Sequence, residues 1–330
     1  MFLPAGSRSR SGVITPGMTS ARRGEFALGM QLLPPSCGRL TLTTATPVLT
    51  TTTSAKTTLY FTPYLGNMTW LYNGTAFVPY FFNEISVLTT DTTKNPAAIG
   101  ASKVNDWFLW DDSGILRLTH SVDWTNDTTR ASSLTLKNGV YLNTSAIANG
   151  PQALRGTYVG TTRSNSSSQL DMIFGGSASG GTAGFFGVWN MYNRIQAVAT
   201  VTDSGTTYTY TSATVRQARA SAGNQVSFIL GLNENPISAS YSWRGTTTNA
   251  NGAFQVWGCG LDVTTTMTTQ RIYGYNNATS AVNITSGTHN LNAYAGLGFH
   301  FVSANEASDG TNANSYNGDN GNVLIVTVWL

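Results

Sequence analysis

The sequence predicts an all-β protein, with an antiparallel sandwich or jelly-roll-like body behind an extended N-terminal arm. Three observations lead to this. Charged residues make up only 10% of the 330 residues, so windows with the Glu, Lys, Arg and Ala spacing of long helices are scarce. Short segments such as RLTLTT alternate apolar and polar residues, as half-buried strands do. Gly, Asn and Asp recur between these segments as turn residues.

The size of the core is bounded by composition. Hydrophobic residues make up 41% of the chain, which excludes disorder of the whole chain. A chain of this length can form one large β domain or two smaller ones. We expect three parts, an arm over residues 1–38, an N-terminal β domain over 39–145 and a C-terminal β-sandwich domain over 146–330.

The arm is predicted to be extended because prolines interrupt any helix and Ser, Gly and Arg dominate its composition. It is either a disordered tail or a tether that becomes ordered on a partner. The apolar run over residues 24–33, beside the arginines, favours the tether. We therefore expect the arm to be a partner-binding anchor, with four basic anchoring residues, namely Arg8, Arg10, Arg22 and Arg23.

The net charge of the chain resides in this arm. Its four arginines stand against Glu25, which gives +3, whereas the remaining residues hold 14 basic and 14 acidic groups. A neutral body argues against nucleic-acid binding by the globular part, since phosphate contacts need clustered Lys and Arg. The arm could contact either a nucleic acid or an acidic protein surface.

Turn signals place three hairpins in the N-terminal domain. Asn73-Gly74 separates MTWLY from AFVPYFF, and Asn138-Gly139 separates SLTLK from VYLN. The sequence DDSG at 111–114 separates WFLW from ILRLTH. Asn-Gly between apolar runs is a strong hairpin signal because both residues accept a positive φ.

The C-terminal domain follows a linker or loop near residues 145–155. Its segments TTYTYTSATV, VSFILGL, ISASYSW, AFQVWGCGLDV and NVLIVTVWL read as strands spaced for a sandwich. The segment GGSASGGTAG at 175–184 is expected to be a flexible loop. There is no 20–50-residue repeat and no heptad pattern, which argues against a propeller, a solenoid or a coiled-coil stalk.

Two cysteines, Cys37 and Cys259, lie far apart in the sequence and lack metal-binding spacing. Two free thiols are the favoured interpretation, and a disulfide between them stays open. The N-terminus lacks the apolar stretch of a secretory signal, and no apolar run approaches the ~18 residues of a membrane span. We expect a protein that is made and soluble in a cytoplasm, without membrane partners.

Residues that could support catalysis are few. None of the three histidines, His120, His289 and His300, has a metal-binding spacing, and no GxSxG motif is present. His300 is expected in an apolar strand and His289 in a turn. The acidic residues are expected at turns, where Asp caps the backbone, rather than as a glycosidase pair or a calcium site. These are Asp106, Asp111, Asp112, Asp123 and Asp127.

The sequence therefore predicts no catalytic residue, no metal and no cofactor. Aromatic residues make up 11% of the chain, and most of the tryptophans are expected in the core. Exposed aromatic residues could stack on sugars or anchor protein interfaces, but the sequence does not identify which ones. The Asn-x-Thr/Ser sequons, such as those at Asn67, Asn73 and Asn283, carry little weight in a Thr-rich chain.

The block CGRLTLTTATPV…TTLYFTPYLGN…WLYNGTAF at residues 37–77 resembles virion appendage proteins of tailed bacteriophages and prophages of proteobacteria. The segments LRGTYVGTT and LNAYAGLGFHFVSANEASDGT look like later parts of the same family. The resemblance implies a β-rich, trimeric structural protein without catalysis. It carries over no functional residue, and residues 1–36 lie outside it.

These observations together predict a virion structural protein of tail-fibre or spike type, made in the host cytoplasm. Its arm would dock to other virion proteins, a tail adaptor or nozzle or a capsid protein, and its body would meet host-surface glycans. A capsid decoration or head-fibre protein is the nearest alternative. A carbohydrate-binding or carbohydrate-degrading β-sandwich protein is the alternative from another class.

Overall fold

The computed structural model describes residues 36–248, 250–279 and 283–330. Residues 35–330 form one compact unit, which is all-β in its described part, with antiparallel sheets and one short 3-10 turn, η1 (Ala218–Ala220). The predicted fold class of the body is thus confirmed. The arm and its residues Arg8, Arg10, Arg22 and Arg23 lie outside the described residues.

Strands from the first part of the chain form three small sheets. Strand β3 lies between β1 and β6, β4 pairs with β5, and β7 and β11 lie at the centre of a six-stranded sheet. Their bounds are β1 Gly38–Thr41, β3 Thr58–Pro63, β4 Met68–Tyr72, β5 Phe77–Phe81, β6 Ile85–Leu88, β7 Val104–Asp112, β8 Ile115–His120, β9 Leu134–Lys137, β10 Val140–Asn143, β11 Thr157–Arg163 and β15 Val188–Asn190.

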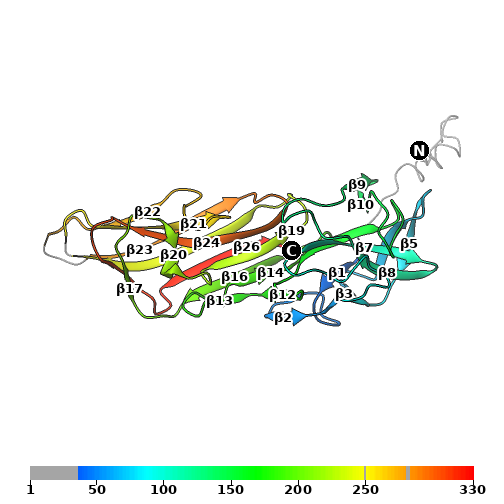
Figure 1. The fold of residues 1–330 in the computed structure, drawn as a ribbon, viewed down its shortest axis with the longest axis horizontal. Helices are drawn as coiled ribbons and strands as arrows, with labels where there is room; N and C mark the ends of the chain where they lie inside the picture. Colours follow the sequence, from blue (N-terminus) through cyan, green and yellow to red (C-terminus); the bar gives the residue numbers. More distant parts are fainter. Residues whose placement is uncertain (1–35, 249, 280–282) are drawn as a thin grey trace, which may run out of the picture. The chain divides into compact units, whose positions relative to one another are not determined.

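Two larger sheets form a sandwich (Figure 1). The eight-stranded sheet has the order β2-β12-β14-β19-β24-β21-β22, with β18 also on β24. Its bounds are β2 Thr53–Lys56, β12 Leu170–Ile173, β14 Gly184–Phe186, β18 Arg216–Gln217, β19 Gln225–Leu230, β21 Phe254–Leu261, β22 Ile272–Tyr275 and β24 Gly298–Ser308.

The facing seven-stranded sheet has the order β13-β16-β26-β20-β25-β17, with β23 also on β20. All pairings in the two sheets are antiparallel except β13 with β16 and β14 with β19. Its bounds are β13 Gly175–Ser177, β16 Gln196–Asp203, β17 Tyr208–Tyr210, β20 Ile237–Thr247, β23 Asn283–Ala293, β25 Asn314–Tyr316 and β26 Asn322–Trp329.

One hydrophobic core fills the space between these two sheets and continues into the sheets of β1, β3, β7 and β11. Strand β26 buries Leu324, Val326 and Val328 on one face. Across the core, Trp243 of β20 stacks on Trp257 of β21 with ring centroids 3.9 Å apart. The expectation that most tryptophans are in the core is confirmed, since five are under 4% exposed, namely Trp107, Trp124, Trp189, Trp243 and Trp257.

The three predicted hairpins are present. Strands β7 and β8 join through Ser113-Gly114, and β9 and β10 through Asn138-Gly139. All four of these residues have positive φ, from +49° to +92°, as the two-residue turns of right-twisted hairpins require. The β4–β5 hairpin has a four-residue loop over 73–76, in which Asn73 Oδ1 accepts from the backbone N–H groups of Thr75 and Ala76.

The Gly-rich segment at 175–184 differs from the flexible loop expected of it. Residues 175–177 form strand β13 beside β16, and β14 begins at Gly184. The backbone approaches closely here, because a Cβ on Gly176 would lie 2.4 Å from the carbonyl oxygen of Thr182. The glycines therefore permit close strand packing rather than motion.

Strands from either side of residue 145 share sheets. Strand β10 pairs with β11 through Leu142 and Thr157, and β2 pairs with β12 through Lys56 and Leu170. A division into domains at 39–145 and 146–330 stays a prediction.

The Asn138-Gly139 turn gives a direct stability test. Gly139 has φ +83° with open space around it, so Gly139→Ala is expected to destabilise through backbone strain alone, by about 1 kcal/mol. Gly175→Ala is the matched control, because its Cβ would meet only Thr200 O at 3.7 Å and its φ lies outside the left-handed region. Urea denaturation should show no loss for the control; equal losses would contradict the turn argument.

Candidate functional site

The sequence predicted Asp106 at a turn, and this prediction is wrong. Asp106 lies inside strand β7 and is 2% exposed. Arg130 Nε donates to its Oδ2 at 2.7 Å, and Thr161 Oγ1 donates to its Oδ1 at 2.7 Å. Arg130 also donates to the carbonyl oxygen of Gly231 at 2.5 Å and lies over the Trp124 ring. Asp106 therefore has a cation and a hydroxyl as fixed partners and serves to join β7, β11 and the chain near Gly231.

The other predicted acidic residues serve the fold at the surface. Asp111 accepts from Gly114 N at 2.7 Å, which confirms the turn interpretation for this residue. Asp123 accepts from Asn105 Nδ2 at 3.0 Å. Asp112 pairs with Lys94 and Arg117, and Asp127 pairs with Arg163 at 3.0 Å.

A buried carboxylate that sequence reasoning did not single out is Glu306 of β24, which is 0% exposed. Its Oε1 accepts from Arg216 Nε at 2.9 Å and from the backbone N–H of Arg219 at 3.1 Å, and Tyr208 donates to its Oε2. Burial raises the pKa of Glu306 to about 7, against the lowering effect of these donors. No local sequence signal marks it, since its partners lie about 90 residues earlier.

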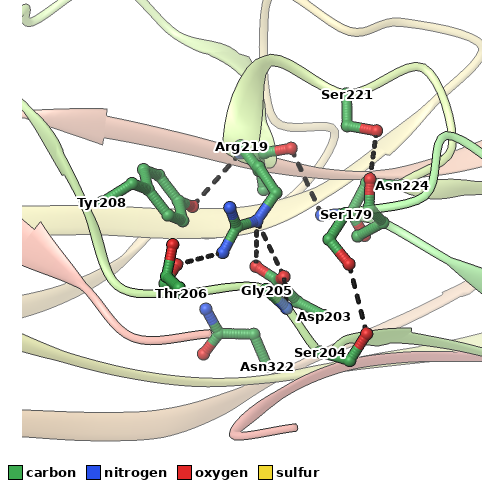
Figure 2. A network of polar contacts seen from close by, with 12 residues as sticks. Ser179, Asp203, Ser204, Gly205, Thr206, Tyr208, Arg219, Ser221, Asn224 and Asn322 are labelled. Atoms are coloured by element: carbon green, nitrogen blue, oxygen red, sulfur yellow. Dashed lines mark hydrogen bonds and ion pairs between the residues drawn. The ribbon is translucent and has the colours of Figure 1, made fainter. Parts of the chain in front are cut away.

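A second ion pair adjoins this carboxylate. Figure 2 shows the guanidinium of Arg219 directed at Asp203 and the backbone of Thr206. Arg219 Nε lies 2.7 Å from Asp203 Oδ1, and Asp203 is 2% exposed. Ser179 and Ser204 lie in the same network, with their hydroxyls 3.2 Å apart. The network joins β16, β17, β18, β24 and η1, and its charges are compensated internally.

The histidines are buried in the fold. His300 lies in strand β24, which confirms the prediction that it is in a strand, and its Nδ1 is 2.8 Å from Asp262 Oδ2. His289 was expected in a turn, but it lies inside β23, where its Nδ1 accepts from Cys259 N at 3.3 Å. His120 lies between the carbonyl oxygens of Ser121 and Ala97. Burial lowers the pKa of both His120 and His289.

A pocket of about 260 Å³ at the β4–β5 hairpin is lined by both aromatic and charged groups. The ring of Tyr72 lies under the ammonium of Lys137, with Nζ 4.3 Å from the ring centroid. Burial, together with a hydrogen bond to Asp111, raises the pKa of Tyr80. The lining residues are Leu71, Tyr72, Asn73, Tyr80, Asp111 and Arg155.

A second outward surface is an aromatic cluster on β21 and β22. Tyr273 and Tyr275 are 44% and 51% exposed, and their rings are near-parallel with centroids 5.8 Å apart. Phe254 contacts both tyrosines from the neighbouring strand. Their i, i+2 spacing places both tyrosines on one face of the strand. Sequence reasoning left the surface-binding aromatics unknown, and these two surfaces supply candidates.

No disulfide joins Cys37 and Cys259. Burial raises the pKa of the Cys259 thiol to about 12, which makes it a poor nucleophile. Over the described ranges, no group of three or more His, Cys, Asp or Glu residues could hold a metal ion. Nor does that part of the chain contain a helix with the length and apolar character that crossing a membrane needs.

Comparisons with known proteins give only distant likenesses. No family model and no curated protein matches the sequence. Latent PorU from Porphyromonas gingivalis is 11% identical with TM-score 0.27 over 69% of this chain, which spans only 22% of PorU. The infectious bursal disease virus Gx strain structure is 11% identical with TM-score 0.29, over 92% of this chain and 76% of that one. An exo-β-1,3-galactanase from Phanerochaete chrysosporium is 9% identical with TM-score 0.17, covering 83% and 55%. At these TM-scores the likenesses carry no argument about function.

Proposed function

We propose that this chain is a structural protein of a tailed-bacteriophage particle, a tail fibre or spike-type appendage that attaches to the host surface. Its N-terminal arm, with Arg8, Arg10, Arg22 and Arg23, docks to another virion protein. Its β body projects outward and acts without catalysis. The resemblance of residues 37–77 to virion appendage proteins supports this assignment.

The observation that carries the proposal is the set of apolar side chains exposed on a strand scaffold. Large exposed apolar groups mark interaction surfaces when they are grouped, and aromatic residues dominate binding energy at such surfaces. The aromatic cluster at Tyr273 and Tyr275 is one such place. Others that are more than half exposed are Leu65, Phe81, Leu88, Ile115, Leu136, Ile284 and Tyr294.

The engagement of the buried carboxylates favours a structural role over carbohydrate cleavage. Glycoside hydrolysis needs two carboxylates that face one sugar. Asp106, Asp203 and Glu306 are instead each paired with an arginine inside the fold. These acids therefore serve to join strands.

Oligomerisation is part of the proposal, because several copies convert weak surface contacts into avidity. We expect a homotrimer, on the basis of the family resemblance and the exposed apolar side chains. Light scattering at micromolar concentration should give three times the mass of the 330-residue chain, and a monomer would count against this part of the proposal.

Deletion of residues 1–36 tests the arm. The deletion leaves the compact unit nearly complete, so we expect a folded body that no longer joins the particle. The matched control replaces Arg8, Arg10, Arg22 and Arg23 by Gln, which keeps the length of the arm and removes its charge. Normal incorporation of the truncated protein into the particle would contradict the prediction that the arm is a tether.

The location of the chain in the native particle tests the function itself. A cryo-electron reconstruction with the body at the tail and the arm inside a tail adaptor or nozzle protein is the expected result. Density over the capsid lattice would show that the chain is a capsid decoration or head-fibre protein and not a tail fibre. Absence from the particle would overturn the virion assignment.

A further inference from the structure

Most of the described cations have partners inside the fold, which makes the exceptions informative. Eight of the 14 Lys and Arg residues after the arm form ion pairs with Asp or Glu. Arg39, which forms none, is buried and donates to the carbonyl oxygens of Pro47 and Leu330. Five other cations form no ion pair with the described residues, namely Lys56, Lys103, Lys137, Arg155 and Arg271.

One of these five, Arg155, lines the pocket at the β4–β5 hairpin. A second, Lys137, lies next to a lining residue, because its ammonium is over the ring of Tyr72. The guanidinium of Arg155 lies against the turn, since a Cβ on Gly74 would be 2.2 Å from Arg155 Nη2. No other described residue accepts a hydrogen bond from this guanidinium, so its donors are available to a ligand.

The size of the pocket limits the ligand. Small-molecule sites range from roughly 300 to 1,000 Å³, and this pocket of about 260 Å³ falls just below that range. Such a volume suits one sugar ring better than a larger ligand. Tyr80, which is half-buried, offers the combination of apolar ring and polar tip that stacks on a sugar while leaving its hydroxyls hydrated.

The polar groups of the pocket are held in place before a ligand arrives. Asp111 accepts from Gly114 N and from Tyr80, which fixes a carboxylate that can accept from sugar hydroxyls. Asn73 uses Oδ1 to cap its own turn. Arg155 presents a planar fork of donors, which matches the two oxygens of a carboxylate or phosphate.

We propose that this pocket binds an anionic sugar, a pyranose with a carboxylate or phosphate substituent. Arg155 binds the anionic group, with Lys137 adding positive charge beside it. Tyr80 stacks on the ring, and Asp111 accepts from its hydroxyls. The inference deepens the proposed attachment function by naming the class of surface glycan, and it rests on that function for its biological meaning.

The test is a binding titration followed by NMR with the full chain and three probes, methyl β-D-glucuronide, glucose 6-phosphate and methyl β-D-glucoside. At least one anionic sugar should bind with a millimolar Kd, about tenfold more tightly than the neutral glucoside. Arg155→Ala should weaken that binding about tenfold, and Arg155→Lys should weaken it less because charge remains. Which anionic probe binds distinguishes a carboxylate ligand from a phosphate ligand.

Lys103→Ala is the matched control, because Lys103 also lacks an ion pair and does not line the pocket. It should leave sugar affinity unchanged, and the thermal midpoints of all variants should agree. No binding of either anionic sugar below about 10 mM, or equal affinity for Arg155→Ala and the unaltered protein, would overturn the inference. A failure to bind these sugars would not change where the chain lies in the particle. Absence of the chain from the particle would not change whether the pocket binds these sugars, so each experiment tests one proposal without the other.

Discussion

Replacement of Asp106 by Ala is expected to lower the free energy of unfolding by about 3 to 5 kcal/mol. The substitution leaves Arg130, whose side chain is 11% exposed, without its anion in the interior. It also removes the acceptor of Thr161 between β7 and β11. Removing one partner of a buried ion pair is costly because the remaining charge has neither its partner nor water around it. Urea denaturation followed by tryptophan fluorescence measures the loss.

Asp112→Ala is the matched control, since Asp112 lies on the same strand and also pairs with cations. Its partners Lys94 and Arg117 remain in contact with water after the substitution, so little stability should be lost. Asp106→Asn keeps an acceptor for Thr161 and should fall between the two. Similar losses for Asp106→Ala and Asp112→Ala would show that burial does not set the strength of these pairs.

The second large effect is a loss of stability as the pH rises, caused by Glu306. Its pKa is about 7 in the folded chain and near the ordinary 4.5 in the unfolded one, so between these values the folded state holds the extra proton. The stabilisation is complete below about pH 4.5 and is lost as the pH rises through about 7. A shift of this size corresponds to roughly 3 kcal/mol.

The comparison of the unaltered protein with Glu306→Gln isolates this contribution. Gln resembles the protonated carboxyl and does not titrate, so the difference in unfolding free energy between the two proteins should change by roughly 3 kcal/mol from pH 4.5 to 8. The two proteins must be compared because His120 and His289, whose pKa values are lowered in the folded chain, make stability rise with pH. Their contribution is the same in both proteins and cancels in the difference. Parallel stability curves over this range would show that Arg216, Arg219 and Tyr208 keep Glu306 ionised throughout.

Local sequence signals predicted the features that depend on neighbouring residues. Alternation gave the strands, and Asn138-Gly139 and Ser113-Gly114 gave hairpins, because turn geometry is set by two adjacent residues. The fold class followed from these signals. His289 was misplaced because the small residues before it resemble a turn, whereas β23 continues through them and buries His289 against β21.

The buried charges could not be predicted because their partners are remote in sequence. Asp106 resembled a turn residue until Arg130 and Thr161 were placed beside it. Glu306 depends on Tyr208, which lies 98 residues earlier. The same holds for the sugar pocket, where only the tertiary fold brings Asp111 and Arg155 together at the β4–β5 hairpin.

The pairing order of the seven-stranded sheet has a consequence for how the chain folds. Strand β26, at residues 322–329, lies between β16 and β20, and so joins segments that begin more than a hundred and more than eighty residues earlier. Closing such long loops costs entropy before any contact compensates for it, so folding should be slow. During synthesis β16 and β20 are made before β26, the strand that lies between them, so their apolar faces are exposed to solvent until β26 is available. The sandwich is therefore expected to form only after residue 329 has left the ribosome, and chaperone binding is expected to matter most in that interval.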